Sequence, residues 1–282
     1  MQETYAQEDH LESQDVSSAS KKSWLPEGVQ ELFIELAGAF KFIARFFKDV
    51  FRPPYEMKEV LNQCYIIGYK TLPLIIFTGY IGGIVFTRQS RPSLESFGAV
   101  SWLPSLVGVG IIRSLGPLIA GLIGAGKIAS NIGAELGSMK VTEQIDAMEV
   151  SGTNPFTYLV ITRVLACMLM IPLLVIFTDT MAMLGGFTSI YFKEGISFTL
   201  YWAEAFSVLK MEDIFASTLK SLLFGFAIGI IGCYKGFTSK KGTVGVGKAA
   251  NSAVVLSMFM IFVIDLMTLQ IMTFVRNLIY SV

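Results

Sequence analysis

The chain has 282 residues, of which 53% are hydrophobic, 12% are aromatic and only 16% are charged. This apolar fraction exceeds what a soluble domain of that length needs to bury, so the composition excludes an ordinary soluble enzyme and predicts a polytopic, all-α integral membrane protein. Basic and acidic residues balance at 22 each, which gives no reason to expect a nucleic acid as a partner.

The first two predicted segments precede the membrane spans. Residues 1–23 are rich in Glu, Asp, Ser and Gln and predict a disordered tail. They lack the basic start and apolar stretch of a secretory signal and are too acidic for a transit peptide, which favours a bacterial inner-membrane protein. Residues 24–54 carry apolar side chains at helical spacing opposite charged ones. This pattern predicts an amphipathic helix in the membrane interface that ends before a Pro-Pro pair.

Residues 55–282 form the predicted transmembrane domain. Crossing about 30 Å of hydrocarbon takes roughly 20 apolar residues, and each span must be helical because lipid offers the backbone no hydrogen-bond partner. Five stretches qualify: Val60–Thr87, Trp102–Gly126, Tyr158–Phe192, Ile214–Tyr234 and Ala250–Phe274. Lys and Arg are concentrated before the first span, after the second and after the fourth. We therefore expect the N-terminus and the loops 127–157 and 235–249 to be cytoplasmic.

Charged residues within the predicted spans are costly and are therefore candidate functional sites. Arg113 lies near the middle of the second span, just before Pro117, which could open the helix and expose carbonyl groups. Its guanidinium could bind a lipid phosphate as a bidentate donor or make a structural hydrogen bond to nearby backbone. Asp179 and Asp265 are similar cases in the third and fifth spans, and their candidate partners across helices are Lys70, Lys220 and Arg113. We expect the two carboxylates to pair with a cation across helices rather than to form a proton path.

Two glycine-rich stretches, GLIGAGK at 121–127 and GTVGVGK at 242–248, match the glycine and lysine spacing of a Walker A loop. Ile128 and Ala249 replace the Ser or Thr that would hold magnesium, and a membrane helix rather than a β-strand precedes each stretch. We therefore expect no nucleotide site in this chain. The three cysteines lie in three different spans and the single histidine lies in the tail, so the pattern predicts no metal site.

The loop after the second span contains the polar stretch GAELGSMKVTEQIDAMEVSG at 133–152. From Thr142, which we expect to cap the helix, strong helix formers set Ile145, Met148 and Val150 against acidic side chains. The pattern predicts a short amphipathic helix with an acidic face. It is either an ordinary solvated loop helix or a docking helix for a soluble partner, which needs an acidic face beside an apolar edge.

Two longer stretches carry a family resemblance. RSLGPLIAGLIGAGKIASNIGAELGSMKVTEQIDAMEVSGTNPFTYLVITRVLA at 113–166 resembles the signature region of the MlaE/YrbE-type permeases of ABC transporters. GCYKGFTSKKGTVGVGKAANSAVV at 232–255 is similar to their second hallmark. The family typically reads Arg-Glu-Leu-Gly-Pro around Arg113, whereas Ser114 occupies the acidic position here. This departure removes a local Arg-Glu pair and leaves Arg113 freer to meet a lipid phosphate.

The resemblance implies a homodimeric permease in a bacterial inner membrane that passes phospholipids to or from a periplasmic MCE-domain lipid-binding protein. It also implies a separate cytoplasmic ATPase dimer that binds ATP and magnesium, so this chain is expected to perform no catalysis and to need no cofactor. The predicted loop helix then looks like the coupling helix that receives the ATPase stroke. Its candidate contact residues are Lys140, Glu143, Gln144, Asp146 and Glu149.

A lipid cavity is expected to be apolar, because each buried methylene contributes about 0.8 kcal/mol. Its candidate wall residues near the outer ends of the first two spans are Phe77, Tyr80, Ile81, Ile84, Leu103 and Leu106. The alternative from another class is a stand-alone secondary transporter of a hydrophobic substrate, but such folds show paired halves and this chain shows no internal repeat. A lipid-modifying enzyme would need a cluster of catalytic side chains at the interface, which the sequence does not show.

Overall fold

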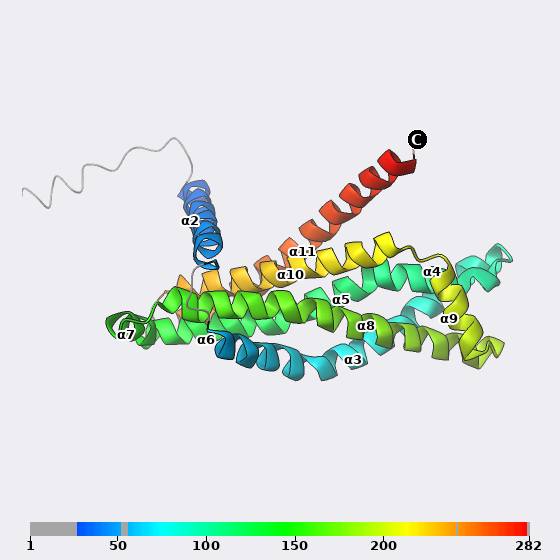
Figure 1. Ribbon diagram of the computed structural model, residues 1–282, viewed down its shortest axis with the longest axis horizontal. Helices are drawn as coiled ribbons and strands as arrows, with labels where there is room; N and C mark the ends of the chain where they lie inside the picture. The colour runs from blue at the N-terminus through cyan, green and yellow to red at the C-terminus, as the bar shows by residue number, and fades with distance from the viewer. Residues whose placement is uncertain (1–26, 52–55, 241, 281–282) are drawn as a thin grey trace, which may run out of the picture. The chain divides into compact units, whose positions relative to one another are not determined.

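The computed structural model describes residues 27–51, 56–240 and 242–280 (Figure 1). The predicted disordered tail at 1–23 lies outside the described residues, as do positions 24–26 and 52–54 of the predicted amphipathic segment. Every element of the described ranges is helical, which confirms the all-α class. The chain divides into two compact units, of which the first ends at Ala44 and the second begins at Arg45.

The described elements, in chain order, are α2 (Glu27–Asp49), α3 (Met57–Ser96), η1 (Val100–Trp102), α4 (Leu103–Gly110), η2 (Ile111–Leu115), α5 (Gly116–Gly124), η3 (Ala125–Ala129), α6 (Ser130–Val141), α7 (Gln144–Val150), η4 (Phe156–Ile161), α8 (Thr162–Glu194), α9 (Phe198–Ser207), α10 (Met211–Phe237) and α11 (Thr243–Tyr280). The helix predicted for the amphipathic segment is α2, in which Phe33, Leu36 and Phe40 are exposed. Its location in a membrane interface stays a prediction.

Five helical segments are long and apolar enough to cross a membrane, which confirms the predicted five spans. They are Met57–Ser96, Val100–Val141, Phe156–Glu194, Met211–Phe237 and Thr243–Leu278. Each extends beyond the apolar stretch that predicted it, because a helix keeps its backbone hydrogen bonds after the apolar residues end. The second span shows this most clearly, since it continues as helix for a further 15 residues past Gly126.

The second span changes its hydrogen-bonding pattern twice, from α to π at η2 and again at η3. Such wide turns are rare and frequently occur at functional sites. Pro117 is the second residue of α5 and has no N–H group, so the carbonyl of Arg113, four residues earlier, loses its usual helical donor. The break therefore leaves an unpaired carbonyl deep in a membrane span, and another part of the protein must satisfy it.

Helix α8 is the central span of the second unit. About 61% of its most apolar window is buried, against 28% for α3 and 22% for α11. Glycines bring its neighbours into backbone contact: a Cβ atom at Gly83 would lie 1.9 Å from the Ala182 carbonyl oxygen, and one at Gly185 would lie 2.1 Å from the Tyr80 carbonyl oxygen. Gly225 brings α10 similarly close to α8. Small residues at such crossings allow the close packing on which membrane helices depend.

Helix α9 was not among the predicted elements. Ser197 begins it, because its hydroxyl accepts a hydrogen bond from the Leu200 amide at 3.3 Å. Tyr201 anchors it in a core shared with the second span and α8, where its hydroxyl donates to the Met183 carbonyl at 3.0 Å. This burial raises the pKa of Tyr201. Helix α9 therefore covers the ends of the spans that lie away from α7 (Figure 1).

Candidate functional site

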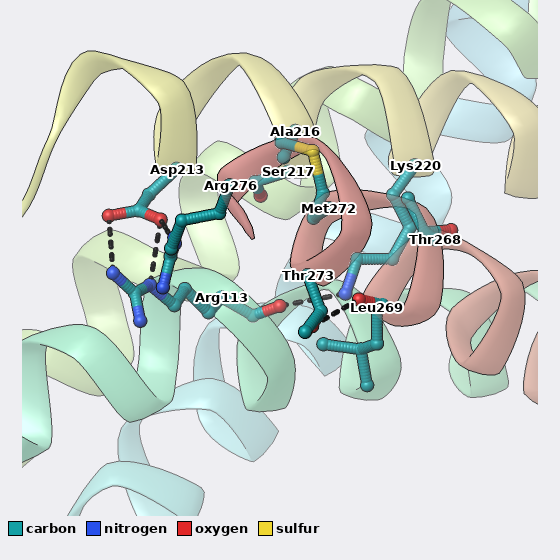
Figure 2. A pocket seen from close by; sticks show the side chains of 10 residues that line it. All are labelled: Arg113, Asp213, Ala216, Ser217, Lys220, Thr268, Leu269, Met272, Thr273 and Arg276. Atoms are coloured by element: carbon teal, nitrogen blue, oxygen red, sulfur yellow. Dashed lines mark hydrogen bonds and ion pairs between the residues drawn. The ribbon is translucent and has the colours of Figure 1, made fainter. Parts of the chain in front are cut away.

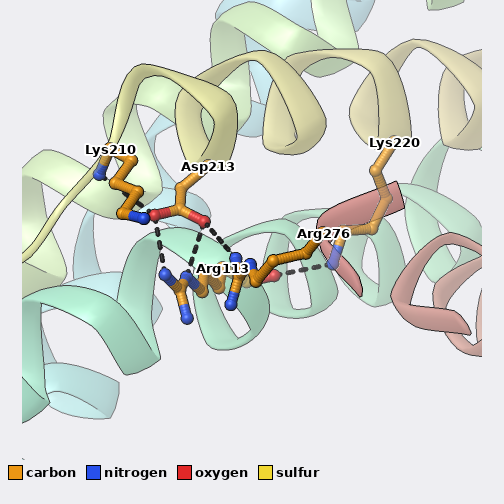
Figure 3. A network of polar contacts seen from close by, with 5 residues as sticks. All are labelled: Arg113, Lys210, Asp213, Lys220 and Arg276. Carbon is orange, nitrogen blue, oxygen red and sulfur yellow. Dashed lines mark hydrogen bonds and ion pairs between the residues drawn. The ribbon is translucent and has the colours of Figure 1, made fainter. Parts of the chain in front are cut away.

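A group of charged side chains lies where the second span, α10 and α11 meet (Figures 2 and 3). Arg113 and Asp213 form its centre: Nη2 of the arginine donates to Oδ2 of the carboxylate at 2.8 Å, and Nε lies 2.8 Å from Oδ1. The Nη2 contact is a charge-assisted hydrogen bond, and the Nε contact adds a close ion-pair approach that makes no hydrogen bond. Arg113 is therefore held in place by α10.

Asp213 is fixed by its position in the first turn of α10. Its Oδ2 accepts a hydrogen bond from the Lys210 amide at 3.1 Å, so the side chain caps the helix and lies at the positive end of the helix dipole. A second guanidinium approaches from α11, where Nη2 of Arg276 donates to Oδ1 at 3.3 Å. One buried carboxylate thus receives donors from three elements.

Lys220 satisfies the carbonyl that Pro117 leaves without a donor. Its Nζ donates to the Arg113 carbonyl oxygen at 2.7 Å and to Oδ1 of Asp265 at 2.7 Å. Both charged side chains are buried, so each neutralises a charge that would otherwise be costly inside the bilayer. The lysine therefore ties the break in the second span to α10 and α11 at one point.

These side chains border a cavity of about 160 Å³ that is open on one side. Its lining residues are Arg113, Asp213, Ala216, Ser217, Lys220, Thr268, Leu269, Met272, Thr273 and Arg276. Three cations face one carboxylate in this lining, and Asp265 beside Lys220 adds a second negative charge. One positive charge is left in excess, so the cavity favours an anion.

The structure changes the interpretation of the predicted intramembrane charges. Neither predicted role of Arg113, a free phosphate donor or a donor to nearby backbone, describes its ion pair with Asp213. The expected pairing across helices occurs between Asp265 and Lys220. Asp179 does not join it: its Oδ1 is buried against Gly116 and has no hydrogen-bond partner among the described residues. The Lys70 side chain is exposed, and its backbone carbonyl accepts a hydrogen bond from Nζ of Lys127.

The candidate wall residues of the lipid cavity do not form one surface. Phe77, Ile81 and Leu106 are exposed, whereas Tyr80 and Ile84 are partly buried. Leu103 was placed wrongly, because it has no exposed surface and packs in the core with Tyr201 and Ala205 of α9. The sequence pattern did not predict α9. It therefore could not predict that α9 covers Leu103.

The predicted loop helix is present as α7, but its start differs from the prediction. Thr142 does not cap it, since its hydroxyl donates back to the Ser138 carbonyl at 2.9 Å. Glu143 is the N-cap residue and adopts a left-handed conformation with φ of 58°. Ile145 is the buried residue that anchors the helix, whereas the prediction was wrong for Val150, which is exposed because it lies in the last turn of α7. The remaining candidate contact residues, Gln144, Asp146 and Glu149, are exposed together with Glu143, and Asp146 pairs with Lys140 at 2.7 Å.

An ion pair between Arg163 and Glu135, which the sequence pattern did not predict, joins the two helices that flank α7. Nη2 of Arg163, at the start of α8, donates to Oε1 of Glu135 in α6 at 2.8 Å, and Nη1 donates to the Leu159 carbonyl at 3.0 Å. Arg163 is buried, whereas Glu135 is half exposed. The pair joins residues 28 positions apart, so no local pattern predicts it, although the charge of Arg163 inside the predicted third span already marks that residue as a candidate. It fixes the spacing between the two ends of the α7 loop.

Both glycine-rich stretches lie in helices. Residues 121–127 run from α5 into η3, and 243–248 form the first turns of α11. Neither is therefore a loop that could surround a phosphate with backbone amides. Within the ranges that the structure describes, no three His, Cys, Asp or Glu side chains gather as metal ligands would.

Comparison with known proteins agrees with this architecture. The family described as Permease MlaE matches residues 60–271, a range that runs into all five spans. A probable ABC transporter permease protein of Rickettsia typhi is 37% identical over 224 residues, which cover 79% of this chain and 86% of that protein. A probable ABC transporter permease protein of Synechocystis is 32% identical over 231 residues, with 82% and 88% covered. One from Pyropia yezoensis is 33% identical, with 73% and 79% covered.

Proposed function

Because the chain belongs to the MlaE family of ABC transporter permeases, we propose that it moves phospholipids between a bacterial inner membrane and a periplasmic MCE-domain lipid-binding protein. The family match over residues 60–271 is the observation that carries this proposal. An ABC transporter permease works with an ATPase, and we assign ATP and magnesium to a separate cytoplasmic ATPase dimer. The chain itself then contributes movement of the spans and no covalent chemistry.

Helix α7 supports a mechanical role toward the ATPase. Its acidic residues Glu143, Asp146 and Glu149 are exposed, while Ile145 fixes the helix to the body of the permease. A helix that presents charge outward and is anchored inward can transmit the displacement of a docked subunit. The Arg163–Glu135 pair would pass that displacement to α6 and α8, which lead directly into the second and third spans. In this arrangement the N-terminus and α7 lie on the cytoplasmic side.

A second copy of the chain is the proposed neighbour of the less buried spans. Only 28% of the α3 window and 22% of the α11 window are buried, although both helices are strongly apolar. Lipid can cover such surfaces, but a homodimer would enclose the apolar space that a phospholipid needs for its acyl chains. The exposed side chains Phe77, Ile81 and Leu106 would then be available to that space.

Co-purification tests the proposal. The chain is purified in mild detergent with the ATPase encoded beside it, and bound phospholipid is measured in the same sample by mass spectrometry. Glu143→Lys combined with Glu149→Lys reverses the exposed face of α7 without breaking the Lys140–Asp146 pair. We expect this variant to lose the ATPase and keep its phospholipid. The matched control reverses Glu204 and Glu212, two exposed acids at the far ends of the spans.

Three outcomes separate the parts of the proposal. If the control also loses the ATPase, net charge rather than α7 determines docking. If wild type never binds the ATPase, the coupling role is wrong. If wild type binds the ATPase but carries no phospholipid above the level of an unrelated membrane protein, the transporter assignment stands and the lipid substrate is wrong.

A further inference from the structure

The two arginines at Asp213 are held very differently. Arg113 contacts both carboxylate oxygens at 2.8 Å. Arg276 makes a single contact, at 3.3 Å, to the same Oδ1 that Nε of Arg113 already approaches. The Asp213 carboxylate also accepts the Lys210 amide, so most of its acceptor capacity is used before Arg276 arrives. Arg276 is therefore the weakest and most easily released partner of this carboxylate.

Arg276 also has donors to spare. A guanidinium carries five N–H groups in a planar fork, and one of them is used here. Its Nε is buried and has no hydrogen-bond partner within the described ranges. A buried donor without an acceptor is unfavourable, so an acceptor that enters the cavity would be bound there. The side chain is 40% exposed, which gives an incoming group access to the other edge of the fork.

The cavity beside Arg276 has the size and charge of a headgroup site. Its volume of about 160 Å³ is too small for a whole lipid but has room for one compact anionic group. The excess positive charge comes from Arg276 and not from Lys220, because Asp265 and a backbone carbonyl already occupy that lysine. The hydroxyl-bearing residues Thr268 and Thr273 and the apolar Leu269 complete the wall on the α11 side.

We propose that Arg276 binds a phosphate group in this cavity, with its guanidinium fork on two phosphate oxygens while Arg113 stays on Asp213. On the proposed transport function, that phosphate is the phosphodiester of an anionic phospholipid headgroup, and the acyl chains lie outside the open side of the cavity. Arg276 itself lies beyond residues 60–271, whereas its partner Asp213 and most of the cavity wall lie within the range that matches the family. Guanidinium groups suit phosphate because two parallel hydrogen bonds form at once.

Binding measurements on purified full-length chain test this site. Native mass spectrometry in detergent compares three probes: phosphatidylglycerol, diacylglycerol with the same acyl chains, and inorganic phosphate as a competitor. Arg276→Gln removes the fork and its charge, and we expect it to weaken phosphatidylglycerol binding about tenfold or more while leaving diacylglycerol unchanged. The control Arg88→Gln removes the same charge from an exposed position on α3 and should change neither.

Arg276→Lys keeps the proposal testable if the glutamine variant folds poorly. It retains the positive charge but presents a point charge instead of a fork, so phosphatidylglycerol binding should fall by a smaller factor than with Gln. If inorganic phosphate at millimolar concentration displaces phosphatidylglycerol completely, free phosphate and not the lipid is the ligand. Equal phosphatidylglycerol affinity of wild type and both Arg276 variants would overturn the site, even if phospholipid transport by the complex persists.

Discussion

Lys220 and Lys140 offer a direct test of how burial sets the value of an ion pair in this permease. Each lysine nitrogen lies 2.7 Å from one carboxylate oxygen, on Asp265 and Asp146 respectively. The side chain of Lys220 is 3% exposed and that of Lys140 is 38% exposed. The test therefore makes the same substitution, Lys→Met, at two sites where the ion-pair distance is equal and the burial of the lysine differs.

The expected costs differ several-fold. Removing one partner of a buried pair costs about 3–5 kcal/mol, because the other charge is left without compensation. Lys220→Met also leaves the Arg113 carbonyl without a donor, which adds about 1–3 kcal/mol. The total of roughly 4–8 kcal/mol approaches the whole stability of an ordinary domain. Lys140→Met should cost no more than about 1 kcal/mol, because water screens the exposed pair.

Thermal unfolding of the permease alone in detergent, followed by size-exclusion chromatography, measures both changes. Lys220→Met should lower the melting temperature sharply or abolish the folded peak, and Lys140→Met should lie within a few degrees of wild type. Adding Asp265→Leu to Lys220→Met should recover most of the loss, since the isolated carboxylate is gone and only the unpaired carbonyl remains. Equal shifts for Lys220→Met and Lys140→Met, or no recovery in the double variant, would refute the reasoning.

Three further predictions concern packing and α7. Gly83→Val should abolish folding, because a Cβ there would meet the Ala182 carbonyl oxygen at 1.9 Å, whereas Gly82→Ala meets only the end of the Ile119 side chain at 3.0 Å and should keep a wild-type melting curve. Ile145→Asp should release α7 and increase its cleavage by added protease, while Val150→Asp, at a position 90% exposed, should leave cleavage unchanged. Glu143→Gly should raise the melting temperature of the isolated permease, because glycine adopts φ of 58° without strain, yet weaken the ATPase complex if the carboxylate contacts it. A lower melting temperature would contradict the last of these.

The number and order of the spans followed from composition and length, because apolar runs of about 20 residues have few other uses. Helix α9 could not be found this way, since its ten residues are too short to span and its stability comes from Tyr201 and Ala205 packing on distant helices. The left-handed Glu143 was missed for a related reason. By local pattern, Thr142 suits the N-cap position as well as Glu143 does. The packing of α7 in the folded protein places Glu143 there instead.

The charged residues of the site show that a sequence pattern can identify a buried charge but not its partner. Arg113 and Lys220 stood out because charges in a span are costly, but their partners lie 100 and 45 residues away. Asp213 gave no such signal, since an acid at the start of a helix is explained locally as a cap. Only the packing of α10 against the second span shows that the Asp213 carboxylate both caps α10 and pairs with Arg113. Pro117 pointed to an exposed carbonyl, and the structure supplied the lysine that satisfies it.

The glycine contacts between α3 and α8 also bear on which parts of the permease can move. Backbone atoms of the two helices touch at Gly83 and at Gly185, with no side chains between them that could change rotamer. A sliding motion would bring a carbonyl oxygen into another backbone atom, so the two spans must travel as one rigid body. The relative movement that transport requires falls to other pairs of helices. A covalent cross-link between α3 and α8 would therefore restrain a freedom that the working cycle does not use.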